Sequence, residues 1–214
     1  MKFNDKMLRQ LMPVLLAFSV TALSLPAVAG KQPTIQELIK AGTQAATQKN
    51  FAEAERIYRR AVELYPDDSV ANYNLGTALY DQGKLEEASM SFKRAILIYP
   101  EYAAAYNNLG SVLSDQGKFE EAILNFEIAI KLDPKNSLAY NNLGTALHQQ
   151  GHLDEAIMQY KSAIEIDANN ALAYYNLGLA LREQGKVQAA KDNFDKALSL
   201  DPSLPDPARV SNKK

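Results

Sequence analysis

A 34-residue period runs through most of this chain. Between residues 103 and 136 the sequence carries a Leu-Gly pair, a second Gly, two Ala that flank an aromatic residue, and a closing Pro. The pattern returns, with local exceptions and no insertion, when every position is shifted by 34 residues in either direction. Five units follow one another, at residues 35–68, 69–102, 103–136, 137–170 and 171–204. A fixed period of this length predicts a solenoid of stacked units rather than a globular domain.

Each unit is predicted to form two helices. Counted from the first residue of a unit, apolar or small residues at positions 4, 7, 8 and 11 form one helical stripe, and those at positions 17, 20, 24, 27 and 30 form another. Four units have a glycine between the stripes, where a helix end favours the left-handed conformation: Gly83, Gly117, Gly151 and Gly185. Four units have a proline after the second stripe: Pro66, Pro100, Pro134 and Pro202. The predicted fold class is therefore all-α, built from helical hairpins.

Small residues at fixed positions indicate how the two helices of a unit touch. Glycine at position 8 and alanine at positions 20 and 27 allow two backbones to approach closely. An aromatic residue at position 24, such as Phe92 or Phe126, is expected to fill the space beside them. Thr34 and Glu37 have the spacing of a capping box at the start of the first helix.

These landmarks resemble those of the tetratricopeptide repeat (TPR) family, whose units share this period and these Leu-Gly, aromatic, Ala and Pro positions. The resemblance covers residues 35–204 and departs locally from the family pattern at Ala45, Asn72 and Ala168. It implies an α-solenoid, a right-handed TPR superhelix of five helix-turn-helix repeats. It also implies that first helices line a concave groove and that second helices form the outer wall.

The last unit and the chain after it differ from the rest. At positions 21 and 22 the third and fourth units are apolar and the fifth is polar: Ile123-Leu124, Ile157-Met158 and Lys191-Asp192. Polar residues there are expected if no further unit packs on the fifth. Residues 205–214 contain Pro205 and Pro207 and are predicted to be a disordered tail.

The first 29 residues have the layout of a secretory signal peptide. Lys2, Lys6 and Arg9 precede a mostly apolar stretch over 11–25, and the segment ends in Ala27-Val28-Ala29. The alternative is an uncleaved anchor, but the apolar stretch is shorter than the roughly 20 residues that span a membrane. We expect cleavage after Ala29, a linker over 30–34, and export to the periplasm or another extracytoplasmic space, or secretion.

Composition argues against several classes of partner. Removing residues 1–29 leaves 20 basic and 24 acidic side chains, a net charge of −4, so we expect neither nucleic-acid binding nor, after cleavage, membrane insertion. The chain has no cysteine and therefore no disulfide. His148 and His152 are four residues apart, but Gly151 lies between them at a predicted helix end, so we expect no metal site and no cofactor.

The candidate binding residues lie on the first helices, at positions that the buried stripe leaves free. Position 6 is asparagine in four units, although asparagine is unfavourable inside helices: Asn74, Asn108, Asn142 and Asn176. Such amides could bond the backbone of an extended segment, as in the similar superhelix of O-linked N-acetylglucosamine transferases, or they could bond within the hairpin. Position 9 adds small hydroxyl residues: Thr43, Thr77, Ser111 and Thr145. Tyr73 and Tyr175 at position 5, and Tyr80 at position 12, could contact a ligand or be incidental.

The predicted function is protein binding without catalysis. TPR domains that grip the acidic C-termini of chaperones use a clamp of Lys, Asn and Arg, of which only Asn74 is matched here. We expect a scaffold or adaptor that binds an extended segment or partner subunit in its groove. The alternative is an accessory subunit that delivers substrates to a separate enzyme, such as a glycosyltransferase or a cell-envelope processing complex. The sequence leaves the partner and the oligomeric state open.

Overall fold

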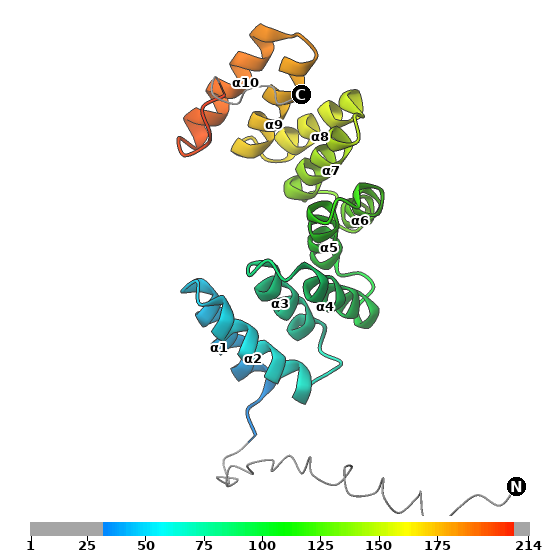
Figure 1. Ribbon diagram of the computed structural model, residues 1–214, viewed down its shortest axis with the longest axis vertical. Coiled ribbons are helices and arrows are strands. Elements are labelled where there is room, and N and C mark those ends of the chain that lie inside the picture. Colours follow the sequence, from blue (N-terminus) through cyan, green and yellow to red (C-terminus); the bar gives the residue numbers. More distant parts are fainter. Residues whose placement is uncertain (1–31, 208–214) are drawn as a thin grey trace, which may run out of the picture. The chain divides into compact units, whose positions relative to one another are not determined.

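The computed structural model describes residues 32–207, so the predicted signal peptide and the end of the predicted tail lie outside the described residues. Within this range the chain forms ten helices and no strand (Figure 1). In order they are α1 (Ile35–Thr47), α2 (Phe51–Leu64), α3 (Ser69–Tyr80), α4 (Leu85–Ile98), α5 (Ala103–Asp115), α6 (Phe119–Leu132), α7 (Ser137–Gln149), α8 (Leu153–Ile166), α9 (Ala171–Glu183) and α10 (Val187–Leu200). Two helices fall in each 34-residue unit, which confirms the predicted all-α solenoid of helical hairpins.

The two helices of each hairpin pack through a glycine on the first helix and an aromatic ring on the second. A Cβ atom added to Gly110 would lie 2.6 Å from a ring carbon of Phe126, and the corresponding pairs in the other units are as close. Phe126 and the alanines on either side of it, Ala122 and Ala129, are buried. The expectation from sequence that small residues permit this approach is therefore confirmed.

The helix ends follow from backbone chemistry. Gly83, Gly117, Gly151 and Gly185 all have positive φ, between 73° and 82°, as the sequence predicts. In the first repeat the same position holds Lys49, with φ 57°, a conformation in which a Cβ atom is disfavoured. The capping box at the start of α1 is present, because Thr34 accepts from the Glu37 backbone and the Glu37 side chain accepts from the Thr34 backbone.

Adjacent hairpins contact each other in two ways. Each second helix packs against the first helix of the next hairpin, and the first helices also contact one another. Second helices of neighbouring hairpins make no such contact within the described residues. The first helices α1, α3, α5, α7 and α9 therefore form one continuous face, which we call the inner face.

On the second helix, the side chain at position 21 of the repeat faces the next hairpin, but the side chain at position 22 does not. Ile157 is buried and Ile123 packs against the core, whereas Lys191 in the last repeat is exposed, as expected for an end. Leu124 and Met158 at position 22 are 58% and 56% exposed. The interpretation of position 22 as an inter-repeat contact is therefore wrong, because one residue further along a helix turns the side chain about 100° towards the outer wall.

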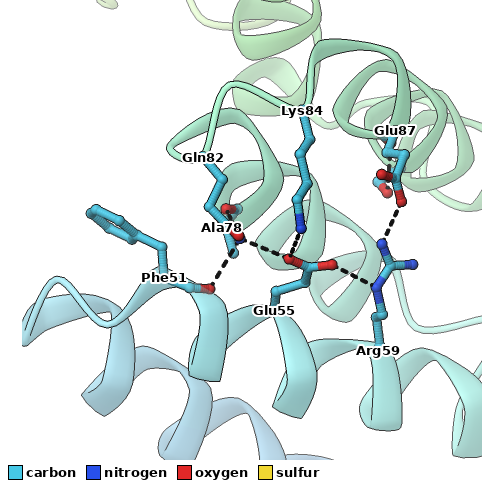
Figure 2. Close-up of polar contacts among 8 residues, drawn as sticks. Phe51, Glu55, Arg59, Ala78, Gln82, Lys84 and Glu87 are labelled. Carbon is cyan, nitrogen blue, oxygen red and sulfur yellow. Dashed lines mark hydrogen bonds and ion pairs between the residues drawn. The ribbon is translucent and has the colours of Figure 1, made fainter.

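Repeats 1 and 2 are joined by a carboxylate instead of an apolar side chain. Glu55 stands at position 21 of the first repeat, on α2, and is only 8% exposed. Its Oε1 accepts from Arg59 Nε at 2.8 Å, and its Oε2 accepts from Lys84 Nζ at 2.6 Å and from Gln82 Nε2 at 2.8 Å (Figure 2). Burial raises the pKa of Glu55, but hydrogen bonds from Lys84, Arg59 and Gln82 outweigh it and lower the pKa to about 2. The buried carboxylate is thus ionised and paired at neutral pH.

Gln82 ties the same joint to the backbone of both repeats. Its amide nitrogen donates to the carbonyl oxygen of Phe51 at 3.2 Å and to that of Ala78 at 2.8 Å. Arg59 also pairs with Glu87 on α4 (Figure 2). The joint therefore links α2 to the end of α3 and to α4.

Among the described residues, no helix is both long and apolar enough to cross a membrane.

Candidate functional site

The four asparagines at position 6 lie half-buried along the inner face, and three of them bond between hairpins. Asn142 Nδ2 donates to Asn107 Oδ1 at 3.2 Å, and Asn176 Nδ2 donates to Asn141 Oδ1 at 2.9 Å. Asn108 Nδ2 donates to the Tyr73 hydroxyl at 3.1 Å. Each donor is 35 residues after its acceptor, so position 6 of one repeat bonds to position 5 of the preceding repeat. The sequence suggested bonds to a ligand or within one hairpin. The structure shows these bonds between hairpins and also bonds within one repeat, where Asn108 Oδ1 accepts from Asn107 at 3.4 Å and Asn142 Oδ1 accepts from Asn141 at 3.5 Å.

Asn74 differs from the other three amides because its neighbour cannot accept. The residue at position 5 of the first repeat is Ile39, whose side chain has no polar atom. No hydrogen bond of the Asn74 side chain is found to any described residue, although the side chain is only half-exposed. This amide is therefore open to a ligand at both its oxygen and its nitrogen.

The hydroxyl residues at position 9 bond to the backbone of their own helix. Thr77, Ser111 and Thr145 donate to the carbonyl oxygen four residues earlier, at 3.1, 3.2 and 3.0 Å respectively. In the first repeat Thr43 is instead 3.1 Å from the hydroxyl of Tyr58. The lone pairs of Thr77 and Ser111 remain on the inner face, whereas Thr145 Oγ1 also accepts from the Tyr160 hydroxyl and from Asn176 Nδ2, both at 3.5 Å.

A second set of contacts joins neighbouring first helices near their C-terminal ends. Tyr80 donates to Asp115 Oδ2 at 2.7 Å, and His148 Nε2 lies 2.8 Å from Glu183 Oε2. Burial, followed by the hydrogen bond with Asp115, raises the pKa of Tyr80 to about 12. These contacts also span 35 residues, from position 12 to position 13 of the next repeat. The carboxylates at position 13 were not singled out from the sequence, although the repeat register could have shown them.

The central part of the inner face is hollowed. A cavity of about 170 Å³ is lined by side chains of α3, α5 and α7 and by one ring of α6: Tyr80, Ser111, Ser114, Asp115, Asn142, Thr145 and Phe126. Ser111, Asn142 and Thr145 were predicted site residues, so the structure brings three of them together. We call this the central pocket.

The two tyrosines proposed as ligand contacts have different surroundings. The Tyr73 ring is half-exposed and lies 4.9 Å from that of Tyr102, centroid to centroid. Tyr175 is only 7% exposed, and its ring packs on Phe194 at 5.5 Å. Its hydroxyl is buried with no hydrogen-bond partner found among the described residues. Tyr73 therefore remains accessible on the inner face, whereas Tyr175 packs within the last hairpin.

The two histidines contact different carboxylates. His148 lies against Glu183, whereas His152 Nδ1 is 3.2 Å from Glu155 Oε2. No group of three His, Cys, Asp or Glu residues in the described range is placed to hold a metal ion.

The sequence matches family models over most of the repeat region. A TPR repeat model matches residues 76–117, 110–151 and 144–185. Other tetratricopeptide repeat models match residues 38–68, 57–88 and 171–204. A search of curated proteins found no match.

Several solved structures are similar to the chain. MamA shares 29% sequence identity with a TM-score of 0.67, over 75% of this chain and 94% of MamA. YrrB, described as a TPR protein with an unusual peptide-binding site, shares 25% identity with a TM-score of 0.62, over 79% of this chain and 88% of YrrB. PilF of Pseudomonas aeruginosa has a TM-score of 0.73 over 82% of this chain and 78% of its own, but at 20% identity it supports the fold alone.

Proposed function

Because the chain belongs to the tetratricopeptide repeat family, we propose that it is a non-catalytic scaffold whose inner face binds an extended segment or a partner subunit in an extracytoplasmic compartment. The observation that carries this proposal is the central pocket, because hydroxyl, amide and carboxylate groups of three successive first helices converge there. A site built from successive repeats suits a ligand that runs along the stack. The description of YrrB as a peptide-binding TPR protein is consistent with such a role.

The proposed compartment rests on the pattern of residues 1–29 alone. A basic start, a short apolar stretch and Ala27-Val28-Ala29 are features of an exported precursor. Fractionation of cells and N-terminal sequencing of the protein test this part of the proposal. A mature protein that begins at Gly30 in the extracytoplasmic fraction is expected, whereas a protein that retains Met1 in the cytoplasm would contradict it.

Site-specific photo-cross-linking tests the binding face. A photoreactive residue at Ala104 would lie on the inner face of repeat 3, and the same residue at Leu124 would lie on the outer face of that repeat. The full chain with the probe at Ala104 is expected to form adducts with a partner in cells. Adducts that form equally at Leu124, or that do not form at Ala104, would contradict the proposal. An enzyme as the cross-linked partner would assign the accessory-subunit role instead.

A further inference from the structure

The inner face is ordered in four parallel rows, because positions 2, 6, 9 and 13 lie on one side of each first helix. Position 2 gives an apolar row, of Val70, Ala104, Leu138 and Leu172. Positions 6 and 9 give the amide row and the hydroxyl row already described. Position 13 gives a mostly acidic row, of Asp81, Asp115, Gln149 and Glu183. From position 2 to position 13 the rows span about 16 Å at 1.5 Å per residue.

The apolar row is open on the surface. Val70 is 43% exposed, Leu138 is 57% exposed and Leu172 is 48% exposed. These side chains lie at the N-terminal ends of their helices, at the side of the inner face opposite to the acidic row. A ligand that runs along the face therefore has apolar side chains at one edge and carboxylates at the other.

The charge on the central inner face is negative. Helices α3, α5 and α7 contain no lysine or arginine, and the acids at their ends are Asp81 and Asp115. The nearby lysines are engaged elsewhere, because Lys84 pairs with Glu55 and Lys118 donates to Gln116. Helix C-termini add partial negative charge at the acidic row. The first and last repeats are different, with Lys40 at position 6 and Arg182 at position 12.

The hydroxyl donors of the inner face already have acceptors within the protein. The hydroxyl protons of Thr77, Ser111 and Thr145 are donated to backbone carbonyls, and that of Tyr80 is donated to Asp115. Asn108 and Asn142 each donate one amide hydrogen bond to the preceding repeat. Asn176 donates there to both Asn141 and Thr145. The lone pairs of Thr77 and Ser111, together with the carboxylate oxygens of Asp81 and Asp115, are thus the acceptors left to a ligand on this surface.

We propose that the inner face of repeats 2 to 4 takes an extended segment rich in hydrogen-bond donors, with arginine or lysine directed to Asp81 and Asp115 and apolar side chains directed to Val70 and Leu138. The proposal rests on the proposed function and specifies its partner. In an extended chain alternate side chains point to opposite sides, so one edge can be apolar and the other basic. First helices about 10 Å apart make three repeats long enough for roughly ten residues at 3.3 Å each.

Synthetic peptides provide the test, with fluorescence anisotropy on the full chain. Three peptides of about ten residues have leucine at alternate positions, separated by arginine, glutamine or glutamate. The arginine peptide is expected to bind most tightly and to weaken as salt is added. D81N/D115N keeps the shape of both side chains and removes two charges. This variant is expected to bind the arginine peptide about tenfold more weakly, since charge-assisted hydrogen bonds are lost, and to bind the glutamine peptide with unchanged affinity.

Matched variants on the outer helix control for net charge and apolar area. Glu120 and Glu121 on α6 are exposed, so E120Q/E121Q makes the same charge change away from the inner face. L138S tests the apolar row, and L124S on the outer face is its control. Equal binding of the arginine and glutamate peptides, or an equal loss in E120Q/E121Q, overturns the proposed partner chemistry. If inner-face cross-links still form, the proposed function survives that result, whereas their absence overturns both.

Discussion

Asn176 Nδ2 donates to Asn141 Oδ1 at 2.9 Å, and this bond joins the last hairpin to the one before it. Donor and acceptor are one period plus one residue apart, as are the corresponding pairs in the middle of the chain. The amide row is therefore part of what holds the hairpins in register, and it also forms the floor of the proposed binding face.

The bond predicts unequal effects of the same substitution at equivalent sites. Asn176→Ala removes the donor to Asn141, whereas Asn74→Ala removes a side chain with no described partner. Both gain about 0.6 kcal/mol of helix propensity. We therefore expect Asn176→Ala to be less stable than Asn74→Ala by about 1 kcal/mol in chemical denaturation. Equal stability of the two variants would show that the bond does not hold the hairpins together.

A glycine in the middle of the stack is expected to be intolerant of a methyl group. Gly110→Ala places a Cβ atom 2.6 Å from Phe126, and the fully buried ring has little room to move. We expect a loss of about 1–3 kcal/mol of folding free energy, measured by urea denaturation. The double variant G110A/F126L should recover part of the loss, because the smaller side chain makes room. If the double variant were no more stable than Gly110→Ala, the loss of folding free energy would come from the backbone and not from the contact with the ring.

Replacing Lys49 should stabilise the first hairpin. Lys49 has φ 57°, and the other repeats place glycine there. Lys49→Gly should relieve the left-handed strain and raise the free energy of unfolding by about 0.5–1 kcal/mol. The control is Gln48→Gly, since Gln48 has φ −83° and gains nothing from glycine. Thermal denaturation distinguishes them, and stabilisation by both variants would contradict the explanation.

The Glu55 joint predicts an acid-sensitive contact between repeats 1 and 2. Its pKa falls from 4.5 to about 2 on folding, so its contribution is present above pH 4.5 and is lost as the pH falls towards 2. The free energy of unfolding of the wild type should exceed that of Glu55→Gln by on the order of 2 kcal/mol at neutral pH. This gap should close as the pH falls through this range. Denaturation at several pH values measures the gap.

An exposed ion pair provides the control for this joint. Glu63 is 65% exposed and lies 3.1 Å from Arg60. Glu63→Gln should change the stability by less than about 1 kcal/mol. If the gap between wild type and Glu55→Gln stayed constant from pH 7 to about pH 2, the charge of Glu55 would not be what joins the repeats.

Much of the fold can be predicted because its determinants are local. Glycine with a left-handed backbone ends the first helix at Gly83 and at the equivalent positions, and the small residue at Gly110 faces Phe126 within one hairpin. These contacts span a single turn or a single hairpin, where helical periodicity fixes which side chains meet. The interpretation of position 22 was wrong because a side chain one residue beyond position 21 is turned about 100° around the helix, towards the outer wall.

For the candidate site, the sequence by itself determined the rows: a 34-residue period places asparagines, hydroxyls and acids in register on the first helices. Only the tertiary structure decided that Asn176 meets Asn141, that Tyr80 meets Asp115, and that Asn74 is left without a partner. The physical reason is the rotation between successive hairpins. It is set by packing of their whole interface, and it brings residues 35 apart, rather than 34, into contact.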